Sequence, residues 1–77
     1  MVNYSIPYGE RMLHIRFQGM SRSIPLTALD VGSLSNDRDV RQAVARYLNV
    51  DYRKLTNYVV ERHANGNMTI RPEAVFG

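Results

Sequence analysis

Residues 37–48 read Asp37-Arg38-Asp39-Val40-Arg41-Gln42-Ala43-Val44-Ala45-Arg46-Tyr47-Leu48. The apolar members of this stretch recur at the spacing that places side chains on one face of an α-helix; they are Val40, Ala43, Val44, Tyr47 and Leu48. Ser35 or Asn36 can cap the start, where Asp37 and Asp39 also suit the helix dipole. Asn49 tolerates the left-handed conformation that ends many helices. We therefore predict an amphipathic helix over residues 37–48.

Two strands are predicted before this helix. Over residues 11–18 apolar and polar residues alternate, which is the period of a half-buried strand. A turn at Gly19-Met20-Ser21-Arg22 leads to a second strand over residues 23–30, which Pro25 restricts to a sheet edge or a bulge because proline has no N–H to donate. The result is a first hairpin.

A second hairpin is predicted after the helix, over residues 58–63 and 68–72. Asn65-Gly66 is typical of a two-residue type I′ turn, because both central positions of that turn need a positive φ. A turn centred there places His63 opposite Met68 and Glu61 opposite Ile70. The segment between Val50 and Leu55 is long enough for one helical turn, but the sequence does not decide its secondary structure.

The order of hairpin, helix and hairpin predicts an α+β domain of ββαββ order, with one helix packed on a small mixed sheet. The chain resembles ubiquitin-like, β-grasp domains over residues 11–72: Met12 to Phe17 and Ile24 to Val31 look like the family's first hairpin, and Asp39 to Val50 looks like its helix. The resemblance implies a fold and a protein-binding role. We expect a loose N-terminal arm over residues 1–10 and a single domain over residues 11–77. The expected core contains Leu13, Ile15, Phe17, Val40, Val44, Leu48 and Ile70.

The end of the sequence departs from the ubiquitin pattern. Ubiquitin and related sulfur carriers present a tail that ends in two glycines, whereas this sequence ends with Phe76-Gly77. A bulky aromatic side chain resists the threaded conformation that activating enzymes need. We therefore expect an interaction module rather than a conjugated modifier, although the sequence does not decide whether Gly77 is functional.

Composition excludes several function classes. The 77 residues include no cysteine, so a thiol nucleophile, a disulfide framework and a thiolate zinc site are ruled out. There is no glycine-rich phosphate loop and no Gly-x-Ser-x-Gly turn, and His14 and His63 lie on separate predicted strands. We expect no catalysis, no metal and no cofactor. The polar start Met1-Val2-Asn3-Tyr4-Ser5 does not resemble a signal peptide and no apolar run could span a bilayer, so we expect a cytoplasmic protein without membrane contact.

The formal net charge is +3, and nine of the ten basic residues are arginine. This excess keeps nucleic acid open as a partner beside another protein. Two surfaces are candidates. A basic ridge along and just past the helix would contain Arg38, Arg41, Arg46, Arg53 and Lys54, with Tyr52 interleaved. The outward face of the first hairpin would present His14, Arg16, Gln18 and Arg22.

Residues 41–58 also fit a helix-turn-helix pattern, with Asn49 at the turn and Asp51 capping a second helix. That interpretation predicts a small DNA-binding protein in which Arg53, Lys54 and Asn57 face the major groove and the second hairpin is a wing. A continuous helix after Asp51 would favour it, and a strand would favour the β-grasp. The sequence does not reveal the oligomeric state.

Overall fold

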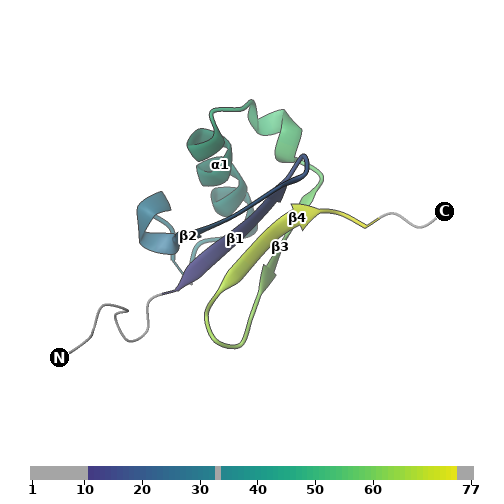
Figure 1. The fold of residues 1–77 in the computed structure, drawn as a ribbon. Coiled ribbons are helices and arrows are strands. Elements are labelled where there is room, and N and C mark those ends of the chain that lie inside the picture. The colour runs from purple at the N-terminus through teal and green to yellow at the C-terminus, as the bar shows by residue number, and fades with distance from the viewer. Residues whose placement is uncertain (1–10, 33, 75–77) are drawn as a thin grey trace.

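The computed structural model describes residues 11–32 and 34–74, and Figure 1 shows their arrangement. The predicted N-terminal arm and the terminal Phe76-Gly77 lie outside these residues. The elements in chain order are β1 (Met12–Phe17), β2 (Met20–Pro25), the short 3₁₀ helix η1 (Leu26–Leu29), α1 (Asp37–Leu48), the short 3₁₀ helix η2 (Tyr52–Leu55), β3 (Tyr58–Arg62) and β4 (Met68–Pro72). Within the described residues, no helix has the length and apolar character needed to cross a bilayer.

The four strands form one mixed sheet in the order β2-β1-β4-β3. β1 pairs parallel with β4 at the centre, and the pairs β1–β2 and β3–β4 are antiparallel. The connection between the two hairpins carries α1 across one face of the sheet (Figure 1). The predicted α+β class and ββαββ order are confirmed, and the topology is β-grasp-like.

The helix lies where its sequence predicts. Asn36 caps the start, with its side-chain oxygen accepting from the Asp39 backbone N–H at 2.8 Å, and Asn49 ends the helix at φ 59°. Asp37 pairs with Arg62 of β3 at 2.7 Å, and the same guanidinium donates to the Ser35 carbonyl at 2.8 Å. These contacts join the helix start to the sheet edge.

The first hairpin corrects the prediction for residues 23–30. Its turn is Gln18-Gly19, with φ of 50° and 81°, so β2 begins at Met20 opposite Phe17 and ends at Pro25. Leu26 to Leu29 then form η1 instead of continuing the strand. Leu26 and Leu29 are both buried, and the three-residue spacing between them matches the 3₁₀ period rather than the strand period. β2 is an edge strand, as Pro25 predicts.

The second hairpin has a longer loop than predicted. The His63 N–H donates to the Asn67 carbonyl and the Gly66 N–H to the His63 carbonyl, both at 2.9 Å, and Gly66 adopts φ 92°. This loop has three residues and ends in a left-handed glycine. The predicted register is therefore wrong by one residue: Val60 pairs with Ile70, and Arg62 with Met68. The shift turns Val60 toward the core and Glu61 away from it.

The core lies between α1 and the sheet. Six of the seven predicted core residues are buried: Leu13, Ile15, Phe17, Val40, Val44 and Ile70. Leu48 is only half-buried and Tyr47 is 40% exposed, which corrects the predicted helix face. Each step of four residues turns about 40° around a helix, so Leu48 has rotated about 80° from Val40, toward the flank. Leu55 of η2 is fully buried instead.

Candidate interaction surfaces

The predicted basic ridge is divided among several places. Arg41 is half-buried: its Nε donates to the Tyr52 hydroxyl at 3.3 Å, and its terminal nitrogen donates to the Tyr58 carbonyl at 3.4 Å. It therefore connects α1 to η2 and β3. Tyr52 packs against the core, so neither residue projects freely toward a partner.

The remaining ridge residues do not form a single stripe. Arg53 is bound to Asp51, which accepts from its backbone N–H at 2.9 Å and pairs with its guanidinium at 3.1 Å. Hydrogen bonding from Arg53 lowers the pKa of the Asp51 carboxyl and raises that of the guanidinium. Arg46 lies five residues after Arg41, about 140° around the helix and thus on the opposite flank. Arg38 and Lys54 are exposed.

The second predicted surface lies on the sheet face that α1 leaves uncovered (Figure 1). His14 and Arg16 alternate with the buried residues of β1 and therefore point to this face. His14 pairs with Ser23 of β2 and with Thr69 of β4, which places three polar side chains in a row across the sheet. His14 Nδ1 is hydrogen-bonded to the Ser23 hydroxyl at 2.6 Å.

The β3–β4 hairpin extends this open face. His63 Nε2 is hydrogen-bonded to the Thr69 hydroxyl at 2.8 Å, and Arg71 pairs with Glu61 at 2.9 Å. The hydrogen bond from Arg71 lowers the pKa of Glu61 and raises that of Arg71. We call the surface made by Met12, His14, Arg16, Ser21, Ser23, Val59, Glu61, Thr69 and Arg71 the open sheet face.

Arg22 does not belong to the open sheet face, which corrects the predicted hairpin surface. The turn at Gln18-Gly19 pairs Arg22 with Ile15, so its side chain lies on the helix side of the sheet. Its guanidinium lies 5.9 Å from the centre of the Tyr47 ring and donates to the Tyr47 hydroxyl at 3.5 Å. It therefore covers part of that exposed ring.

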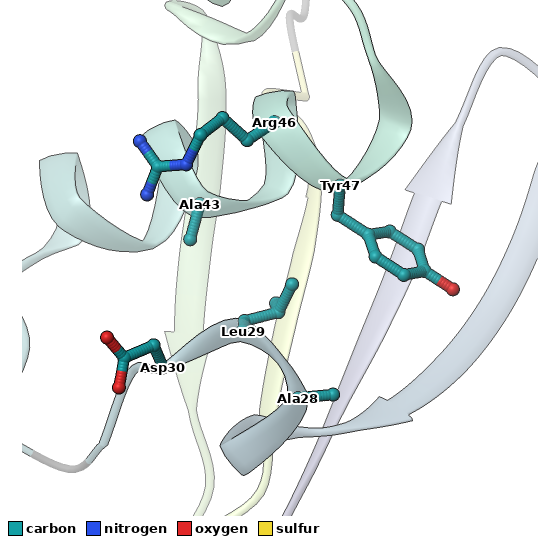
Figure 2. Close-up of a pocket in the computed structure, with 6 residues that line it drawn as sticks. All are labelled: Ala28, Leu29, Asp30, Ala43, Arg46 and Tyr47. Atoms are coloured by element: carbon teal, nitrogen blue, oxygen red, sulfur yellow. The ribbon is translucent and has the colours of Figure 1, made fainter.

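A groove that the sequence did not predict separates η1 from α1. Figure 2 shows Ala28, Leu29 and Asp30 on one wall and Ala43, Arg46 and Tyr47 on the other, around a hollow of about 390 Å³. The Tyr47 ring lies at one end, whereas Asp30 and the Arg46 guanidinium lie toward the other. The groove exists because residues 26–29 form a turn, where the sequence predicted a strand.

The side chains that could bind a metal ion or act as acid and base lie apart from one another in the described residues. No group of three His, Cys, Asp or Glu side chains gathers there at metal-binding distance. The two histidines are each hydrogen-bonded to a hydroxyl on a neighbouring strand. No protein-family model matches the chain, and comparisons with curated proteins and with solved structures find no significant match.

Proposed function

We propose that this protein is a small non-catalytic binding module of the ubiquitin-like type, and that its open sheet face binds another protein. The observation that carries the proposal is the sheet face opposite α1, which runs across β2, β1, β4 and β3 and over which no helix of residues 11–32 and 34–74 lies. The β-grasp-like topology and the sequence pattern together support the ubiquitin-like assignment. The cytoplasmic location expected from the sequence is part of this proposal.

The side chains of the open sheet face suit a protein partner. Hydroxyls, an imidazole, a carboxylate and guanidinium groups lie there, so the face offers hydrogen-bond donors and acceptors and charges of both signs. Arg71 is neutralised by Glu61, whereas Arg16 is exposed and has no ion-pair partner within residues 11–32 and 34–74. We therefore expect Arg16 to bind a carboxylate of the partner.

A nucleic-acid partner is supported less well by this surface. Its strand positions in the described residues include no Phe, Tyr or Trp on which a base could stack. The helix-turn-helix alternative also lacks its second helix, because Tyr52 to Leu55 form only one 3₁₀ turn and Tyr58 to Arg62 form a strand. The strand Tyr58–Arg62 is the outcome that the β-grasp interpretation predicts for this segment.

Site-specific photo-crosslinking in the source cell tests the proposal. The photoreactive residue replaces Ser21, which is exposed on the open sheet face opposite Arg16, or, as the control, Arg38 on the exposed side of α1. We expect a discrete protein adduct from position 21 that is absent from position 38, and we expect Arg71→Glu to reduce its yield. Adducts to nucleic acid, or equal protein adducts from both positions, would contradict the proposal.

A further inference from the structure

A charged stripe runs along the rim of the groove between α1 and η1. Asp39, Gln42 and Arg46 follow one another at spacings of three and four residues, which places them on one side of the helix. All three line a second hollow that adjoins the groove and shares Arg46 with it. Asp39 and Arg46 are both exposed, and neither has an ion-pair partner within the described residues. Two helical turns, about 10 Å, separate them. One end of the stripe is therefore negative and the other positive.

Two exposed apolar side chains lie near the stripe. Among the described residues, the large apolar side chains left exposed are Leu34, at 99%, and Tyr47, at 40%. Leu34 lines a hollow together with Asp39, and Tyr47 lines the groove with its ring at the end away from the Arg46 guanidinium (Figure 2). Leu34 therefore lies beside the negative charge of the stripe, and the Tyr47 ring lies apart from the positive one.

We propose that this stripe binds a second copy of the chain, with the two α1 helices antiparallel across a two-fold axis near Gln42. In this arrangement Asp39 of each copy faces Arg46 of the other, so two ion pairs form. Gln42 faces Gln42 of the second copy. Two amides can hydrogen-bond to each other because each carries both donors and an acceptor.

The charge pattern favours a second copy over an unrelated partner. A two-fold interface brings the same patch of both subunits together, so a patch is self-complementary only if its charges reverse about its midpoint. On the helix itself, Asp39 and Arg46 meet this condition, because they are equally far from the position between Gln42 and Ala43; the Asp30 carboxylate on the facing wall lies toward the Arg46 end (Figure 2). This surface lies on the helix side of the sheet, so dimerisation leaves the open sheet face free and is independent of the proposed function.

Sedimentation equilibrium at several protein concentrations tests the dimer. We expect the wild type to dimerise more weakly as salt is added, since the exposed ion pairs are screened. Asp39→Arg and Arg46→Asp each place like charges opposite one another, and each should raise the dimer Kd at least tenfold. Arg16→Asp, a charge reversal on the opposite face of the sheet, should leave the dimer Kd within twofold.

Sedimentation of a mixture of the two charge-reversed variants provides the decisive test of the dimer. The Asp39→Arg chain carries arginine at both positions and the Arg46→Asp chain carries aspartate at both, so a 1:1 mixture should form heterodimers although each variant alone is monomeric. Far-UV circular dichroism verifies that both variants are folded, because both reversals also oppose the helix dipole. A monomeric wild type at 1 mM would overturn the proposal. So would a mixture that stays monomeric, or a wild-type Kd that the reversals do not change.

Discussion

At the scale of single residues, Gly66 occupies a position that other residue types cannot adopt without strain. It has φ 92°, and a Cβ at this position would collide with the side chain of Arg11. We predict that Gly66→Ala lowers the free energy of unfolding by about 1–2 kcal/mol, mainly through the left-handed backbone. Gly32 is the matched control, since it has no such φ and a Cβ there meets nothing within 4 Å. Urea denaturation of both variants measures the difference, and equal effects would show that the loop conformation is wrong.

A second prediction compares the loss of stability when either of two leucines is truncated. Leu55 is fully buried and Leu48 is half-buried, although the helical pattern predicts Leu48 as the core residue. We predict that Leu55→Ala costs about 2–5 kcal/mol of stability because it leaves a cavity, whereas Leu48→Ala costs about 1–2 kcal/mol. Chemical denaturation gives both values. A larger loss at Leu48 would mean that the helix is rotated relative to this structure.

At the scale of elements, the helix could be predicted from sequence and the hairpin details could not. Asn36, Asn49 and the apolar spacing between them are local signals, and they placed the helix correctly at 37–48. The limits of β2 depend on whether Gln18 adopts a positive φ, which its residue type does not indicate. The β3–β4 register depends on a loop of three rather than two residues, and Asn65-Gly66 is compatible with both.

The first hairpin turn allows a direct test of this correction. Gln18 has φ 50° and precedes Gly19, so the pair occupies a two-residue turn in which asparagine is the preferred first residue. We predict that Gln18→Asn stabilises the protein by about 0.5 kcal/mol, because asparagine tolerates the left-handed conformation better than glutamine. A thermal melt detects the gain. A lower melting temperature would favour a turn at a different position.

The pairing of Glu61 on β3 with Arg71 on β4 can be tested through the pKa of Glu61. The hydrogen bond from Arg71 holds the pKa of Glu61 below the usual value for a glutamate side chain. A carboxyl whose pKa is lowered by folding stabilises the protein at pH values above its unfolded pKa, and this contribution is lost as the pH falls through the folded pKa. We predict that Arg71→Gln raises the pKa of Glu61 and weakens this part of the acid dependence. Carboxyl-carbon NMR titration reads the pKa directly, and an unchanged value would exclude the pairing in solution.

At the scale of the whole molecule, the candidate surfaces were partly predictable. His14 and Arg16 follow from strand alternation, and the structure places both on the open sheet face. The ridge predicted around α1 failed as a continuous surface because Arg41 contacts Tyr52 and Tyr58, which are distant in sequence. The groove between η1 and α1 was missed for a similar reason. The groove depends on how η1 packs against α1, and no local sequence pattern predicts that packing.

A titration with duplex DNA at low and near-physiological salt separates the proposed protein-binding role from DNA binding. A net charge of +3 that is spread over both faces and partly neutralised by ion pairs predicts weak binding at low salt. That binding should vanish near physiological salt, show no dependence on DNA sequence and change little on Arg53→Ala. Binding that persists at physiological salt, with a log–log salt slope of several units and a sequence preference lost on Arg53→Ala, would contradict the proposed protein-binding role.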